Sequence, residues 1–139
     1  TRTTRVENLS DLLQNCDALS IHCLLSAETR RMVDAAALAL LPSHAVVVNT
    51  ARGPVIDEQA LYEALRAGRL AAAALDVLQQ EPPAGTPLFE AYLRGELPNV
   101  LITPHAAWYS QQSVSELRRK AAEEAGRILR GEPSHNPVP

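Results

Sequence analysis

The sequence predicts an α/β domain built on a doubly wound parallel sheet. Short apolar segments typical of buried strands alternate along the chain with segments of helical periodicity, an order typical of parallel sheets with helical crossovers. Polar residues follow each of the four predicted strands, and the carboxyl ends of parallel strands are where such sheets bind ligands. The 139 residues suffice for one domain with its own core.

The composition argues against several classes of partner. The net charge is −3 with acids and bases interspersed, so there is no electrostatic basis for direct binding of nucleic acid or of an anionic membrane. No apolar run is long enough to span a bilayer, and no signal peptide pattern is present. Cys16 and Cys23 lack metal-site spacing, and we expect two buried, reduced thiols in a cytoplasmic protein. The chain starts at Thr1 without a methionine, and we expect a fragment of a longer protein.

The first part of the chain is expected to form two helices around one strand. A short helix follows the capping residue Asn8 and ends near Asn15. Ala18–Cys23 is expected as the first strand. The second helix covers Asp34–Leu41, with the aspartate as its cap.

The second strand, Ala45–Asn49, contains three consecutive valines, which suit a pleated surface and leave no polar face. We therefore expect a fully buried strand. The turn through Gly53-Pro54 places Arg52 at its carboxyl end. The planar guanidinium of an arginine there could hold a carboxylate, although an arginine on a surface loop would have the same local sequence.

The next helix opens with the acidic residues Asp57 and Glu58, and Gly68 stands where a glycine ends a helix. The elements after it are expected in the order strand, loop-rich segment, short helix within that segment, and strand: Ala71–Val77, Gln79–Pro98, Leu88–Leu93 and Val100–Thr103.

A long helix is expected over Ser113–Arg130. Ser113 and Glu116 have the spacing of a capping box, and Gly131 ends the helix. The tail Glu132–Pro139 is expected to be an extended strap or a disordered end. An apolar stripe along the helix is compatible with packing on the sheet and equally with a subunit interface; it consists of Val114, Leu117, Ala121, Ala125 and Ile128.

The polar residues after the four strands are expected to converge on one crevice, because the ends of parallel strands share one sheet edge. Three of them, Arg52, Glu81 and His105, form a set suited to acid–base chemistry. A histidine exchanges protons near neutral pH, and a carboxylate beside it fixes its orientation. Together with a carboxylate-binding arginine, this set suits a 2-oxo or 2-hydroxy acid, with hydride supplied by a cofactor.

Three motifs resemble the family of D-isomer-specific 2-hydroxyacid dehydrogenases: Asn49–Gly53, Ala74–Val77 followed by Glu81-Pro82, and Thr103–Ala107. The resemblance implies a Rossmann-type NAD-binding domain, of which the chain carries the second half and the long C-terminal helix. Residues 1–131 would belong to this domain, and residues 132–139 would lead to, or strap, the substrate domain.

Within the family, His22–Leu25 and His105–Ser110 are more similar to the C-terminal-binding-protein branch, which consists of nucleotide-responsive transcriptional corepressors with a dehydrogenase fold. Trp108 would favour a bulky apolar substrate group if it faces the substrate. Trp108-Tyr109 could equally serve core packing or an interface.

The resemblance implies individual roles. Arg52 would bind the substrate's carboxylate and carbonyl, His105 would be the acid–base group, and Glu81 would pair with His105. A small 2-oxo or 2-hydroxy acid would be the substrate, and a homodimer is the expected assembly. The residues expected to line the nicotinamide and ribose are Cys23, Leu24, Leu25, Ser26, Thr29, Thr50, Ala51, Arg52, Asp76, His105, Ala106, Ala107 and Trp108.

The chain contains no glycine-rich G-x-G-x-x-G turn. That turn and the acidic residue that reads the ribose hydroxyls belong to the first half of a Rossmann domain, expected before Thr1. NAD is the implied cofactor, and NADP is not excluded. Three functions stay open: an NAD-dependent D-2-hydroxyacid dehydrogenase, an NAD(H)-sensing binding protein like the corepressors, and an inactive remnant.

Overall fold

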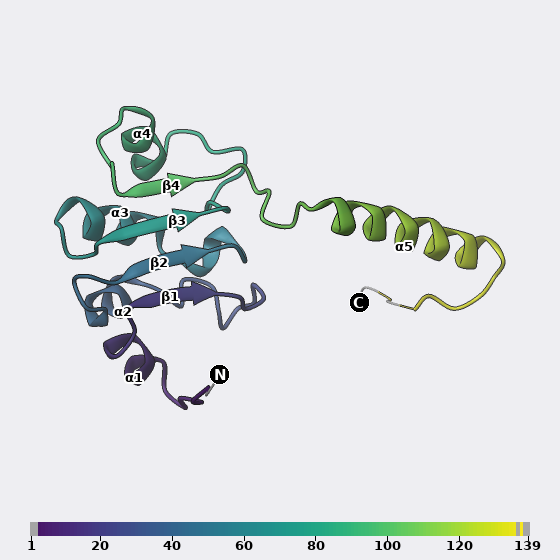
Figure 1. The fold of residues 1–139 in the computed structure, drawn as a ribbon, viewed down its shortest axis with the longest axis horizontal. Helices are drawn as coiled ribbons and strands as arrows, with labels where there is room; N and C mark the ends of the chain where they lie inside the picture. Colours follow the sequence, from purple (N-terminus) through teal and green to yellow (C-terminus); the bar gives the residue numbers. More distant parts are fainter. Residues whose placement is uncertain (1–2, 136, 138–139) are drawn as a thin grey trace. The chain divides into compact units, whose positions relative to one another are not determined.

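The computed structural model describes residues 3–135 and 137, and the chain forms two compact units, Thr1–His105 and Ala106–Pro139 (Figure 1). The first unit contains one parallel sheet whose strands are ordered as in the sequence. The strands are β1 (Ala18–Ile21), β2 (Val46–Asn49), β3 (Ala72–Leu75) and β4 (Val100–Ile102). The helices of this unit are α1 (Leu9–Gln14), α2 (Ala35–Leu40), α3 (Glu58–Arg66) and α4 (Pro87–Leu93). The prediction of a parallel α/β sheet is confirmed.

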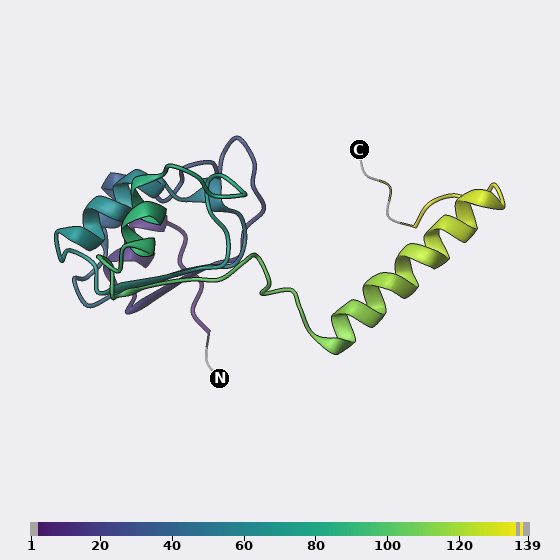
Figure 2. The same ribbon diagram turned by 90° about the horizontal axis from the view of Figure 1, so that it is seen from above.

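One face of the sheet carries the core. Leu19 pairs in register with Val47, Val47 with Ala73, and Ala73 with Val100, and all four are buried. Helices α2, α3 and α4 lie on the same side of the sheet (Figure 2). They contact one another in chain order. Leu61 of α3 is 1% exposed, and burying a side chain of this size contributes roughly 1.5–3 kcal/mol.

The opposite face of the sheet is less covered than we predicted. Val46 and Val48 are half-buried, and Leu101 is 57% exposed. The expectation of a fully buried second strand is therefore wrong for two of its three valines. The reason is topological, since right-handed crossovers between strands that advance in one direction place their helices on the same face.

All four strands are shorter than the sequence prediction, by one residue for β2 and β4 and by more for β1 and β3. β1 ends at Ile21, whose partner Asn49 ends β2, so His22 and Cys23 lie beyond the paired region. β3 ends at Leu75, one residue before Asp76. A short 3-10 helix, η1 (Gly53–Val55), forms in the predicted turn after β2.

The long helix α5 (Gln111–Leu129) starts earlier than predicted. Ser110 caps it, and the capping box consists of Ser110 and Ser113 instead of Ser113 and Glu116. Glu116 forms an ion pair of 3.2 Å with Lys120 instead. In the part of the chain that the structure describes, no residue of α5 is buried.

The start of the predicted tail lies along α5. The backbone N–H of His135 donates to Glu124 at 2.7 Å, and Arg127 Nη2 donates to the carbonyl of Pro133 at 3.0 Å. The Ser134 hydroxyl also bonds to Glu124 and holds the pKa of this carboxyl below its usual range. The last part of the predicted tail, Asn136, Val138 and Pro139, lies outside the described residues.

Both cysteines are unpaired and partly buried, and burial raises the pKa of the Cys16 thiol. Within residues 3–135 and 137, no helix is both long and apolar enough to cross a membrane.

Candidate functional site

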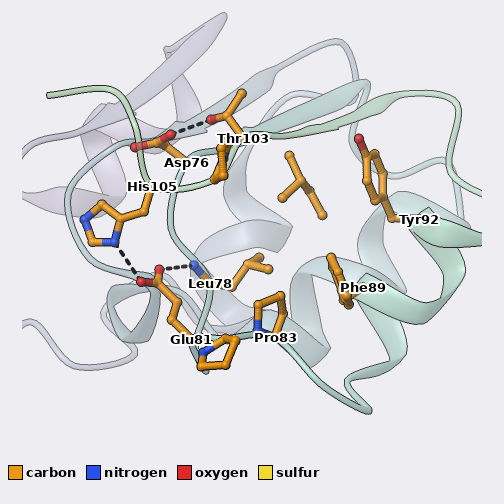
Figure 3. A pocket seen from close by; sticks show the side chains of 11 residues that line it. Asp76, Leu78, Glu81, Pro83, Phe89, Tyr92, Thr103 and His105 are labelled. Carbon is orange, nitrogen blue, oxygen red and sulfur yellow. Dashed lines mark hydrogen bonds and ion pairs between the residues drawn. The ribbon is translucent and has the colours of Figure 1, made fainter. Parts of the chain in front are cut away.

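His105 and Glu81 form a pair of reactive groups at the carboxyl edge of the sheet. His105 Nδ1 lies 2.7 Å from Glu81 Oε2, and the backbone N–H of Leu78 donates to Glu81 Oε1 at 3.0 Å (Figure 3). The side chains of His105 and Glu81 are 44% and 37% exposed. An ionised carboxylate can only accept, so Nδ1–H is the donor in this pair. The arrangement holds the imidazole in one orientation and one tautomer.

The backbone of His105 has a φ of 53°, which is the left-handed region that side chains with a Cβ rarely adopt. Its N–H donates to the carbonyl of Thr103 at 3.0 Å. Such a conformation costs of order 1–3 kcal/mol and persists where the surrounding structure holds it, which is a common property of functional sites.

Asp76 is a buried carboxylate directly after β3, and it is 5% exposed. The Thr103 hydroxyl donates to Asp76 Oδ1 at 2.5 Å, and the Asp76 N–H donates to the carbonyl of Asn49 at 2.9 Å. The ends of β2, β3 and β4 are thereby joined, and the convergence predicted for these three strand ends is present in the structure.

Arg52 lies in the turn after β2 with an exposed side chain. Asn49, which is 1% exposed, bridges this turn: its Nδ2 donates to the carbonyl of Arg52 and its Oδ1 accepts from the N–H of Ala51, both at 3.0 Å. Arg52 Nη1 donates to the carbonyl of Ala51 at 2.7 Å. Asn49 thus holds the arginine's backbone, a role the sequence analysis did not assign. Its signal in the sequence is an amide at the last position of a predicted strand.

The Arg52 turn and the Glu81 loop touch at Gly53. A Cβ at this glycine would lie 1.9 Å from the carbonyl oxygen of Leu78 and 2.6 Å from the nitrogen of Gln79. Real Cβ atoms essentially never approach backbone so closely, so glycine is required here. The contact brings the arginine turn against the loop that carries Glu81.

The loop after β1 is closed by its own hydroxyl groups. The Ser26 N–H donates to Thr29 Oγ1 at 2.8 Å, the Thr29 N–H donates to Ser26 Oγ at 3.2 Å, and the Thr29 hydroxyl donates to the carbonyl of Leu24 at 2.6 Å. Leu24 is 86% exposed, whereas Cys23 and Leu25 pack partly against the core. Ser26 and Thr29 therefore shape this loop.

A cavity of about 410 Å³ lies between the Glu81 loop, the end of β4 and α4 (Figure 3). His105 and Glu81 lie at one side of it, and Phe89 and Tyr92 at the other. Phe89 and Tyr92 are not among the residues predicted for the site, although their spacing of three residues places both on one face of a helix. The lining residues are Asp76, Leu78, Glu81, Pro82, Pro83, Phe89, Tyr92, Ile102, Thr103, Pro104 and His105.

Ala106, Ala107 and Trp108 belong to the second unit. Trp108 is 54% and Tyr109 66% exposed, and their rings meet edge to face with centroids 5.8 Å apart. Neither ring is a core residue of this chain. No cluster of metal-ligating side chains occurs among the described residues.

Comparisons with known proteins bear on the family and the fold of the chain. Residues 1–107 match the family described as "D-isomer specific 2-hydroxyacid dehydrogenase, NAD binding domain". The chain is 38% identical over 133 residues to D-3-phosphoglycerate dehydrogenase of Methanocaldococcus jannaschii, an alignment that covers 96% of this chain and 24% of the relative.

Solved structures show the same fold. D-lactate dehydrogenase from Aquifex aeolicus, complexed with NAD and lactic acid, is 30% identical with a TM-score of 0.81, over 89% of this chain and 40% of that one. The D-isomer specific 2-hydroxyacid dehydrogenase from Xanthobacter autotrophicus, complexed with NADPH and MES, is 39% identical with a TM-score of 0.72, over 94% of this chain and 40% of that one.

The chain therefore spans less than half the length of each of these proteins. The resemblance seen in the three sequence motifs is confirmed, as is the Rossmann-type fold. The chain belongs to the D-isomer-specific 2-hydroxyacid dehydrogenase family, as part of its NAD-binding domain.

Proposed function

We propose that the protein carrying this chain is an NAD-dependent oxidoreductase that acts on the CH–OH group of D-2-hydroxy acids and, in reverse, reduces 2-oxo acids. The observation that carries this proposal is the 2.7 Å contact between His105 Nδ1 and Glu81 Oε2, at the carboxyl edge of a parallel sheet. An imidazole that is oriented by a carboxylate at such an edge is suited to proton transfer to and from a bound small molecule.

The proton-transfer role belongs to His105 Nε2. Since Glu81 engages Nδ1, Nε2 is the ring nitrogen on the other side of the imidazole, away from the carboxylate. During reduction, a protonated His105 donates its Nε2 proton to the carbonyl oxygen of the 2-oxo acid. During oxidation, the neutral ring accepts the proton of the substrate's hydroxyl group at Nε2. Glu81 orients the ring.

Arg52 is proposed to bind the carboxylate of the substrate. Its guanidinium offers two parallel N–H donors, which match a carboxylate geometrically, and its backbone is held by Asn49. A substrate that presents a carboxylate beside a carbonyl would span Arg52 and His105.

The NAD cofactor, when bound, supplies or accepts the hydride. The strand-end groups fit part of such a cofactor, because a carboxylate such as Asp76 and the backbone after β2 can hydrogen-bond ribose hydroxyls and a carboxamide. The segments proposed to line it are Cys23–Ser26 with Thr29, Thr50–Arg52, Asp76 and His105–Trp108. The NADPH complex of the Xanthobacter relative is the reason to test both nucleotides.

The test is a set of steady-state assays on the full-length protein, which measure oxidation of NADH and of NADPH with a panel of 2-oxo acids. We expect His105→Ala to lower kcat by roughly 10²–10⁴, the usual contribution of a general acid. His44→Ala is the control, because His44 is an exposed histidine that pairs with Asp17. Turnover that survives His105→Ala unchanged would refute the mechanism.

A nucleotide-sensing binding protein is the second candidate. The exposed Trp108-Tyr109 pair supports it, because exposed aromatic side chains are enriched at binding surfaces. Under this proposal NADH changes the oligomeric state, measured by sedimentation, while no 2-oxo acid is turned over efficiently. Efficient turnover without any effect of NADH on assembly contradicts it.

We also infer a homodimer in the cytoplasm. Leu117, Ile128 and Leu129 of α5 are 60%, 61% and 88% exposed, which leaves apolar surface for a partner subunit. Two unpaired cysteines suit a reducing compartment. Sedimentation equilibrium of the full-length protein tests the dimer, and a monomer at micromolar concentration contradicts it.

A further inference from the structure

Glu58 is a buried carboxylate without a role in the proposed mechanism. It is 7% exposed at the first position of α3, and its Oε2 accepts the N–H of Gln79 at 2.9 Å. Among the described residues, no group hydrogen-bonds to its buried Oε1. Burying a carboxylate with so few hydrogen-bond partners costs folding free energy. A contribution to the stability of α3 alone therefore does not explain why Glu58 is buried.

The cap of α3 is already provided by another residue. Asp57 Oδ1 accepts the N–H of Ala60 at 3.2 Å, and Asp57 has the extended backbone of a helix cap. Glu58 directs its carboxylate to the loop after β3 instead, where the amide of Gln79 lies 21 residues further along the chain.

The peptide group between Leu78 and Gln79 is held from two directions. Gly53 packs against it so closely that no Cβ fits, and Glu58 accepts its N–H. Gly53 is the first residue of η1, which follows directly after Arg52, and Glu58 is the first residue of α3. The clamp formed by Gly53, Glu58 and this peptide therefore joins the arginine turn to the loop of Glu81.

The clamped peptide is linked to the His105–Glu81 pair through Leu78. The N–H of Leu78 donates to Glu81 Oε1, and Glu81 Oε2 meets His105 Nδ1 (Figure 3). A shift of Leu78 would turn the Glu81 carboxylate and release the imidazole. We propose that Glu58 is a positioning residue, whose carboxylate oxygen, by holding the Gln79 amide, fixes Glu81 against His105 and sets the spacing between His105 and Arg52.

This inference rests on the proposed function for its kinetic test, and what it requires of Glu58 is an acceptor oxygen at the right reach. Glu58→Gln keeps both the reach and an acceptor oxygen. Glu58→Asp keeps the charge at the start of α3, which favours folding, but is one methylene too short. Glu63→Ala removes an exposed glutamate of the same helix that bonds to Gln59, and serves as the control.

In the full-length protein we expect Glu58→Asp and Glu58→Ala to lower kcat by roughly tenfold to a hundredfold, the scale of a small misplacement in an active site. The KM for the nucleotide should stay within about twofold. Glu58→Gln and Glu63→Ala should retain kcat. A near-normal Glu58→Asp together with an impaired Glu58→Gln would overturn the proposal, because charge and not reach would then matter.

A second measurement does not depend on turnover. The hydrogen-bonded Nδ1–H of His105 should give a low-field proton resonance by NMR, present in the unmodified protein and in Glu58→Gln, and lost or broadened in Glu58→Asp. Persistence of this resonance in Glu58→Asp overturns the inference even if the protein is an active dehydrogenase. Its loss in a protein without dehydrogenase activity supports the clamp and refutes the proposed function alone.

Discussion

Arg52 presents its guanidinium from a turn whose two ends are bound by the buried side chain of Asn49. If the guanidinium binds the substrate carboxylate through two parallel hydrogen bonds, Arg52→Lys keeps the charge and loses the planar fork. We expect kcat/KM for 2-oxo acids to fall roughly tenfold to a hundredfold, since a hydrogen bond to a charged group contributes about 1.5–3 kcal/mol.

The measurement is steady-state kinetics with varied 2-oxo acid at saturating nucleotide. The matched control is Arg66→Lys, an arginine of α3 that lies over the Tyr62 ring. If both variants lose activity equally, or if Arg52→Lys changes the KM of the nucleotide and not that of the acid, Arg52 does not bind the carboxylate.

For single residues, whether a functional role can be predicted from the sequence depends on how far away in the chain the partner lies. Arg52, Glu81 and His105 stand out because they follow strands, and the structure brings Glu81 and His105 to within 2.7 Å. Glu58 did not stand out, because an acidic residue at a helix start is ordinary, and its partner Gln79 is distant in sequence.

Among the elements, α3 shows how local signals and a distant contact combine. Asp57 caps the helix, and the side chain of Arg31 binds the same carboxylate. The Arg31 hydrogen bond is the main reason that the pKa of Asp57 lies below its usual range. The cap is readable from the sequence, whereas the arginine comes from the segment before α2.

This double role predicts a pH-dependent difference between two variants. Asp57→Asn keeps a good cap and loses the ion pair with the mostly exposed Arg31, so we expect it to cost at most about 1 kcal/mol of unfolding free energy. Asp57→Ala also loses the cap and should cost about 1–2 kcal/mol.

Because the folded-state pKa of Asp57 is lowered, its ion-pair contribution is complete above the unfolded-state pKa of about 3.9 and is lost as the pH falls through the folded-state value. The difference between wild type and Asp57→Asn should therefore be constant near neutral pH and shrink in acid. Urea unfolding at several pH values measures it. A difference that persists in acid, or equal costs for both variants, contradicts this account.

For α5, in contrast, the local capping signal in the sequence predicted the wrong start of the helix. A serine–glutamate spacing predicted the capping box at Ser113, but Ser110 makes the same reciprocal bonds with Ser113 one turn earlier. Two capping patterns of similar strength overlapped in the sequence, and the chain adopts the earlier one.

For the whole molecule, the chain supplies the residues after the strands but no glycine-rich turn. In Rossmann domains this turn and the helix behind it bind the pyrophosphate. We expect the isolated 139-residue chain to bind NADH at least roughly a hundredfold more weakly than the full-length protein, since several charge-assisted hydrogen bonds of about 1.5–3 kcal/mol each are missing.

Fluorescence titration of NADH against both proteins makes this comparison. Circular dichroism of the isolated chain serves as the folding control, because an unfolded chain would bind weakly for a different reason. Equal affinity of a folded isolated chain and the full-length protein would show that the pyrophosphate is bound by residues of this chain.

The sequence by itself determined the order of helices and strands, the parallel sheet, the family and the edge at which the polar residues gather. These properties depend on periodicity, on caps and on motifs, which are local in the chain. Only the tertiary structure decided which sheet face the helices cover, that Asn49 bridges the Arg52 turn, and that Gly53 and Glu58 hold the Leu78–Gln79 peptide. Such contacts join residues far apart in the sequence, and their energy depends on distances that exist only after the chain has folded.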